Sequence, residues 1–158
     1  MRILTQQLDI DAPPGVVHPM LVDPDRFVTW MAAEATLDPT PGGELRWTHA
    51  NGDRCAGSYV ELVPYRRVVF TYGWERAEVG IPPGSTTVEI DLEPVAGGTR
   101  LTLVHRGLDD AGAAAHAGGW AHYLHRLGLA AAGRSPGPDP FADRRVPTRE
   151  ERARRAHR

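Results

Sequence analysis

Apolar and polar residues alternate along most of residues 2–107, which is the pattern of strands that bury one face. The alternation is regular in residues 86–93, where Val88, Ile90 and Leu92 lie on one side. Residues 68–74 carry large side chains at alternate positions, and such side chains favour a half-buried pleated surface. We therefore expect strands at residues 3–10, 34–37, 44–49, 54–63, 68–74, 86–93 and 99–106.

Two short helices are expected between the first two strands. Asp11 is a candidate N-cap for the first, because the prolines that follow it suit a first helical turn. Pro24 ends that helix, and Asp23 before it is placed to cap the second. After the last strand, Asp109 or Asp110 is expected to cap one long helix.

The long helix has one apolar face, which at 100° per residue takes His116, Trp120, Tyr123, Leu124 and Leu127. A run of strands followed by a long amphipathic helix is typical of an α+β domain in which the sheet wraps around the helix. Gly118 and Gly119 each weaken a helix by on the order of 1 kcal/mol relative to Ala. We therefore expect the helix to bend or open just before Trp120.

The charge of the chain is unevenly distributed. Residues 1–132 hold 10 Arg and 16 Asp and Glu, which gives a net charge of −6. Residues 133–158 hold 8 Arg and 4 Asp and Glu, which gives a net charge of +4. The chain has no lysine. A folded region of −6 does not favour nucleic acid, so only the basic end is suited to attract phosphates.

The remaining composition is that of an ordinary soluble domain. No run of about 18 apolar residues occurs, so no membrane insertion is expected. The first residues lack a basic segment followed by an apolar one, so no signal peptide is evident. The single cysteine, Cys55, has no partner for a disulfide and fits a cytoplasmic location.

The sequence divides into a folded region, residues 1–132, and a Pro- and Arg-rich tail, residues 133–158. The tail begins with closely spaced prolines that exclude helix and central strand. Thr148 and Glu151 together match a capping box for a short terminal helix. That helix has almost no apolar face, so we expect the tail to be flexible or partly helical.

Several short motifs in order resemble those of START-like (SRPBCC) proteins, in the branch related to the C-terminal domain of the heat-shock-protein-90 ATPase activator. The resemblance covers about residues 3–132. It lies in DIDAPPGVVHPMLVDPDRFVTWM, with Asp23, Pro24, Phe27 and Trp30; in TPGGELRW; in GSYVELVPYRRVVFTYGW, with Gly57, Glu61, Pro64, Phe70 and Trp74; and in GGTRLTLVHRGL and the later GGW.

The resemblance implies a helix-grip fold, in which a strongly curved antiparallel sheet holds the long C-terminal helix and a cavity lies between them. Such cavities hold lipids, polyketides or other apolar molecules. The residues predicted to face inward therefore become candidate ligand contacts as a set, although a packed core is the favoured explanation of any single one of them. They are Trp30, Trp47, Tyr59, Phe70, Tyr72, Trp74, His105, His116, Trp120 and Tyr123.

Three polar residues are candidates for acid–base chemistry. His105 and His116 are expected at the cavity, where a histidine can act as a general base near neutral pH. Glu61 is a weaker candidate, because it alternates with Tyr59 and so should share its face. A hydrogen-bonded structural role is nevertheless the favoured explanation of both histidines. No nucleophile motif or phosphate-binding glycine loop occurs, and no cofactor is expected.

A metal site is not expected either. His122 and His125 lie three residues apart on the long helix, but the sequence offers no third ligand near them. We expect both side chains to be exposed to solvent.

Three functions remain open. The first is a binding protein for an apolar or amphipathic small molecule. The second is a cyclase, dehydratase or hydrolase that uses the same cavity. The third is a chaperone-linked protein-interaction module, and a homodimer is also left open.

Overall fold

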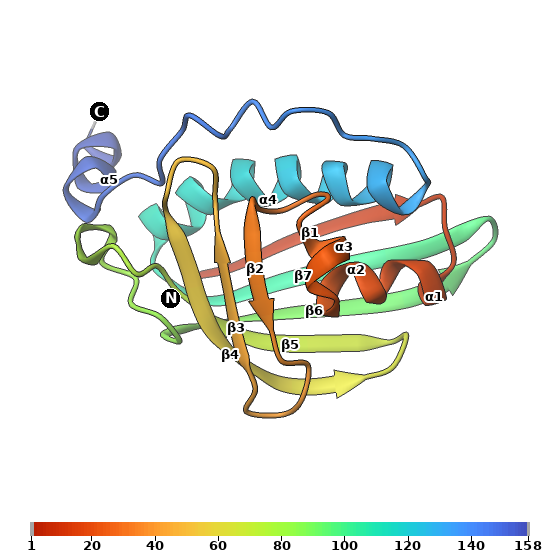
Figure 1. Ribbon diagram of the computed structural model, residues 1–158. Coiled ribbons are helices and arrows are strands. Elements are labelled where there is room, and N and C mark those ends of the chain that lie inside the picture. The colour runs from red at the N-terminus through yellow and green to blue at the C-terminus, as the bar shows by residue number, and fades with distance from the viewer. Residues whose placement is uncertain (1, 158) are drawn as a thin grey trace.

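The computed structural model describes residues 2–157 and has seven strands in one antiparallel sheet (Figure 1). Each strand matches one of the predicted segments, so the fold is the expected α+β class. The order across the sheet is β1-β7-β6-β5-β4-β3-β2. The bounds are β1 Arg2–Ile10, β2 Glu34–Leu37, β3 Glu44–Thr48, β4 Arg54–Val63, β5 Arg67–Tyr72, β6 Thr86–Val95 and β7 Gly98–Leu108.

The connection from β1 to β2 forms three single-turn helices instead of two short ones: α1 (Pro14–Val17), α2 (Pro19–Val22) and α3 (Pro24–Phe27). Each begins with a proline, which suits the first turn but cannot continue a preceding helix. Pro13 occupies the N-cap position of α1, so Asp11 is not the cap. Asp23 caps α3 as predicted, because its side chain accepts a hydrogen bond from the Asp25 amide.

The long helix α4 (Asp110–Ala131) lies across the concave side of the sheet (Figure 1). Asp109 is its N-cap and accepts a 2.7 Å hydrogen bond from the Gly112 amide. Its own residues Leu124 and Leu127 are buried, as the periodicity predicts. The helix continues without interruption through Gly118 and Gly119, so the predicted opening before Trp120 is absent.

The short helices pack against one part of the sheet and contribute to the hydrophobic core. Trp30 and Tyr59 are 1% exposed. The indole of Trp30 donates to the carbonyl of Met20, and the hydroxyl of Tyr59 donates to the carbonyl of Leu21. The Tyr59 bond therefore fastens the helical connection to β4, and the Trp30 bond joins two parts of that connection to each other.

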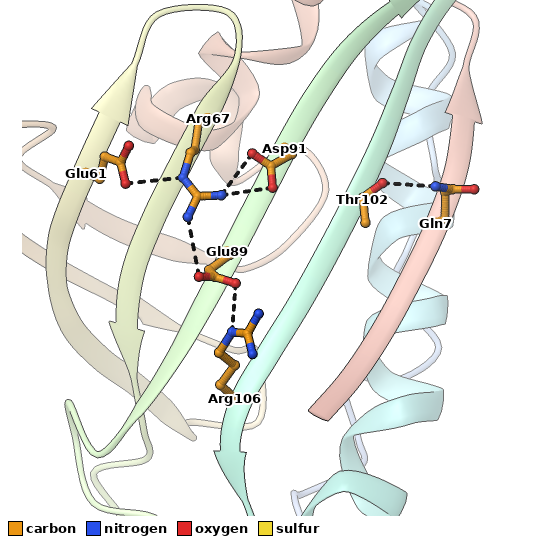
Figure 2. Close-up of polar contacts among 7 residues, drawn as sticks. All are labelled: Gln7, Glu61, Arg67, Glu89, Asp91, Thr102 and Arg106. Atoms are coloured by element: carbon orange, nitrogen blue, oxygen red, sulfur yellow. Dashed lines mark hydrogen bonds and ion pairs between the residues drawn. The ribbon is translucent and has the colours of Figure 1, made fainter. Parts of the chain in front are cut away.

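The outer face of the sheet is polar, and Glu61 belongs to it rather than to the interior. The pairing of β4 with β5 shifts between Tyr59 and Glu61, which is a β-bulge. A bulge adds one residue and reverses the alternation, so the prediction that Glu61 shares a face with Tyr59 is wrong. Figure 2 shows Glu61 paired with Arg67, which also binds Glu89 and Asp91.

The chain after α4 folds back along that helix and ends in α5 (Arg149–Ala156), beside the loop that contains the 3-10 helix η1 (Ala77–Val79) (Figure 1). Thr148 caps α5 by accepting from the Glu151 amide. Within residues 2–157, no helix combines the length and the hydropathy that a membrane span requires.

Candidate functional site

A cavity of about 600 Å³ lies between the sheet, α4 and the folded-back tail. Its size falls in the usual range for small-molecule sites. Aromatic rings form much of its wall. The predicted contacts that line it are Trp47, Tyr72, Trp74, His116, Trp120 and Tyr123.

The other predicted contacts lie outside the cavity lining. Trp30, Tyr59 and Phe70 belong to the buried core, and the first two are held there by hydrogen bonds to the helical connection. His105 is fully buried behind the ring of Trp120. Alternation identifies inward positions on a strand, but it does not say which of them meet empty space and which meet another side chain.

Three tryptophans of the cavity wall each donate their indole N–H to a histidine. Trp47 donates to Nε2 of His49 at 3.1 Å. Trp74 donates to Nε2 of His116 at 3.1 Å, and Trp120 donates to Nδ1 of His105 at 3.0 Å. An indole nitrogen is a donor only, so each of these ring nitrogens must be an unprotonated acceptor.

The tautomer of His105 follows from its second contact. Its Nε2 lies 2.8 Å from the hydroxyl of Thr86, which donates its own proton to the carbonyl of Tyr72. Nε2 therefore carries the proton and donates to Thr86. Burial, helped by nearby His116, lowers the pKa of His105 to about 3. Both ring nitrogens are thus committed to internal bonds.

His116 is fixed in the opposite tautomer. Its Nδ1 lies 2.8 Å from the carbonyl of Gly112 and donates to it, while Nε2 accepts from Trp74. Burial lowers the pKa of His116 to about 4, although the bond to Gly112 opposes the shift. The ring lines the cavity as a neutral group whose nitrogens are both engaged.

A second polar chain runs from His49 to the tail. Since Nε2 of His49 accepts from Trp47, Nδ1 carries the proton and faces the hydroxyl of Tyr123 at 3.4 Å. Tyr123 donates to Asp139 at 2.7 Å, and Asp139 also lies 2.7 Å from Nε2 of His122. Burial, opposed by Asp139 and Asp53, lowers the pKa of His49.

The tail contacts α4 through His122, whose side chain is only 17% exposed. Phe141 stacks on the ring of His122 with centroids 3.8 Å apart. The prediction that His122 is exposed to solvent is therefore wrong, because it considered the helix without the chain that covers it. His125 is exposed as predicted.

The tail also contributes the mouth of the cavity, which the sequence reasoning missed. Asn51 donates to the carbonyl of Arg144 at 2.7 Å. Arg76 binds buried Asp53 at 2.9 Å and the carbonyl of Val146 at 2.7 Å. The only available signals were the charge of opposite sign on the tail and a phenylalanine among its prolines.

The order of these elements is that of a known family. The model of the family described as Activator of Hsp90 ATPase homolog 1-like protein matches residues 11–131. The chain belongs to this family. In residues 2–157 of this AHSA1-like protein, no group of three or more His, Cys, Asp or Glu is placed to hold a metal ion.

A solved structure of another AHSA1-like protein is similar to this chain over most of its length. The solution structure of an AHSA1-like protein from Rhizobium etli has 41% identity and a TM-score of 0.67, and covers 92% of this chain and 91% of its own. Residues 1–132 are 132 of 158, or 84%, so that similarity extends into the tail.

Two further structures support the same fold. A crystal structure from Chromobacterium violaceum has 25% identity, a TM-score of 0.70, and coverage of 82% of this chain and 96% of its own. The Aha1 dimer from Colwellia psychrerythraea has 19% identity, a TM-score of 0.72, and coverage of 84% and 97%. The search of curated proteins finds no match.

Proposed function

We propose that this AHSA1-like protein binds an apolar or amphipathic small molecule in the cavity between the sheet and α4. The observation that carries the proposal is a space of about 600 Å³, walled largely by aromatic rings, beside the hydrophobic core. Packed cores contain few voids larger than a water molecule, so a space of this size is unusual for a core. A mostly apolar wall with a few polar groups is what small-molecule sites have in common.

Hydrogen bonds within the protein hold the walls of the cavity in place. The indoles of Trp47, Trp74 and Trp120 are fixed by their histidine partners, so they are not free to collapse inward. Gly118 and Gly119 line the space, and a Cβ at either position would meet no atom within 4 Å. Preformed walls reduce the entropy cost of binding.

The experiment is a titration with N-phenyl-1-naphthylamine, a neutral apolar dye whose emission rises in apolar surroundings. We expect saturable binding to the wild type. Gly119→Leu places a side chain in the cavity and should weaken binding by about tenfold, the effect of roughly 1.4 kcal/mol.

Ala121→Leu is the matched control, because Ala121 lies on the exposed side of the same helix. It adds the same side chain outside the cavity and should leave the affinity unchanged. If neither substitution changes the affinity for the dye, the dye binds outside the cavity and the proposal is refuted.

A specific observation also favours an acid–base enzyme as a second candidate. The Tyr123 hydroxyl lies at the cavity wall between His49 and Asp139, in a chain of hydrogen bonds along which a proton could move. The nitrogens of His105 and His116 are engaged elsewhere, so Tyr123 replaces them as the residue best placed to act. His49 and Asp139 would then position it.

Native mass spectrometry separates these two candidates. Wild type and Tyr123→Phe are purified identically and their retained molecules are compared. If the protein is a dehydratase or a hydrolase, the wild type should retain product and the variant should retain unconverted precursor, and the two differ in mass. A cyclase can form a product of the same mass, so the released molecules are also compared by their chromatographic retention. A binding protein should retain the same molecule in both, and that result would exclude the role of Tyr123.

A homodimer and a chaperone-linked role remain proposals. They rest on the family description and on the dimer of the Aha1 protein from Colwellia psychrerythraea. Light scattering during size-exclusion chromatography tests the dimer directly. A cytoplasmic location is likewise proposed, from the single buried cysteine, Cys55.

A further inference from the structure

Among residues 2–157, the charged residues that line the cavity are three arginines and one aspartate: Arg144, Arg145, Arg155 and Asp53. The three arginine side chains are exposed, which places them at the mouth, and all of them come from the tail. The described residues before the tail contribute only Asp53 to the charged lining, so the tail reverses the sign of the charge at the entrance.

The aspartate is already neutralised. Asp53 is 3% exposed and is held by two bonds from Arg76, at 2.9 and 3.2 Å. Arg145 lies 3.6 Å from the same carboxylate. Two guanidinium groups therefore share one negative charge, and Asp53 has no capacity left to balance the other cations of the mouth.

Arg144 and Arg155 lack such a partner. Among residues 2–157, no carboxylate lies within 4 Å of either guanidinium. Arg144 is oriented by the ring of Phe141, whose centroid is 4.5 Å away. A guanidinium that packs on an aromatic face still has its N–H groups at the edge of its own plane. Those N–H groups remain able to bind an anion.

A further cation lies beside the cavity. Arg152 is 5% exposed and donates to the carbonyl of Pro147, and in the described chain no carboxylate lies within 4 Å of it. Asp109 acts on this guanidinium from a longer distance and offsets part of its charge, while burial lowers the pKa of Arg152. A buried charge acts on its surroundings more strongly than an exposed one, so Arg152 still adds positive potential beside the cavity.

We propose that the cavity takes an aromatic acid: a planar apolar body between the rings, with a carboxylate, sulfonate or phosphate at Arg144 and Arg155. The inference rests on the proposed binding function and narrows it to one class of ligand. A neutral ligand would leave the two guanidinium groups without a role, and a cation would be repelled by them.

Two dyes with the same body test the inference. 1-Anilinonaphthalene-8-sulfonate carries a sulfonate that N-phenyl-1-naphthylamine lacks. We expect the sulfonate dye to bind about tenfold more tightly than the neutral dye. Added salt should weaken the binding of the sulfonate dye and leave that of the neutral dye unchanged. The double variant R144Q/R155Q should lose about tenfold affinity for the sulfonate and less than about twofold for the neutral dye.

The control R134Q/R154Q removes the same charge from tail residues that do not line the cavity, and should change neither affinity. Circular dichroism checks that each variant is folded. A second arm compares 2-naphthoate with octanoate as competitors, and the naphthoate should displace the sulfonate dye at the lower concentration.

The outcomes separate the two proposals. If neither dye binds, the proposed binding function fails. If both dyes bind equally and R144Q/R155Q changes nothing, the cavity binds ligands but the inference of an acid is wrong. If octanoate displaces the dye better than 2-naphthoate, the aromatic body is wrong.

Discussion

Paired tryptophan and histidine side chains are the distinctive feature at the scale of single residues. His49, His105 and His116 each accept an indole N–H, and each carries its proton on the other nitrogen. A proton added to any of them would meet a donor instead of an acceptor, and would lie in a buried site. Neutral imidazole is therefore part of the folded state.

This arrangement makes stability depend on pH. His105 and His116 have folded pKa values of about 3 and about 4, below the ordinary 6.5. Between those values the unfolded chain binds protons that the folded chain does not, so the free energy of unfolding falls as pH falls from 6.5. We expect a loss of about 2 kcal/mol per histidine between pH 7 and pH 4.5.

Urea unfolding at several pH values measures this dependence. His105→Gln keeps one donor and one acceptor but cannot titrate, so its stability should fall less steeply with pH. His125→Gln, on the exposed face of α4, should keep the wild-type slope. Equal slopes for His105→Gln and the wild type would show that the pKa of His105 is the same in the folded and unfolded protein, which would contradict its lowered pKa.

The tail is the element whose role differs most from its composition. Proline and arginine predict a solvated segment, yet Asp139 joins it to α4 through Tyr123 and His122. Burial disfavours the charge on Asp139, but hydrogen bonds from Tyr123, the Phe141 amide and His122 outweigh burial and lower its pKa. The ionised carboxylate is therefore the form that holds the tail against the helix.

Asp139→Asn should loosen the tail without unfolding the domain. We expect trypsin to cleave after Arg144 and Arg145 about tenfold faster, because loss of a charge-assisted bond of roughly 1.4 kcal/mol raises the open population by that factor. Asp143→Asn is the matched control, since Asp143 is exposed. Similar cleavage of both variants would mean that the tail is held by its other contacts.

The sequence predicted most elements because their patterns are local. Each strand from β1 to β7 was expected within a few residues, since alternation needs only neighbours along the chain. Glu61 was misplaced because one extra residue at a bulge reverses the faces beyond it. No periodicity in a single strand reports such an insertion.

At the scale of the whole molecule, the parts of the site that sequence missed are those made by distant contacts. Asn51 meets the carbonyl of Arg144, and Arg76 meets that of Val146. The net charge of −6 on residues 1–132 and the net charge of +4 on the tail are opposite in sign, which is consistent with the tail folding back. Charge predicts that two regions attract but not which residues meet.

The indoles of the cavity wall give the protein its own optical reporter. Of the 4 tryptophans, Trp47, Trp74 and Trp120 line the cavity, and Trp30 lies apart in the solid core. The wavelength of their fluorescence emission depends on the polarity around each ring. A ligand that displaces water from the cavity therefore shifts the emission maximum. Occupancy can thus be followed in unlabelled protein, with Trp30 as a constant internal background.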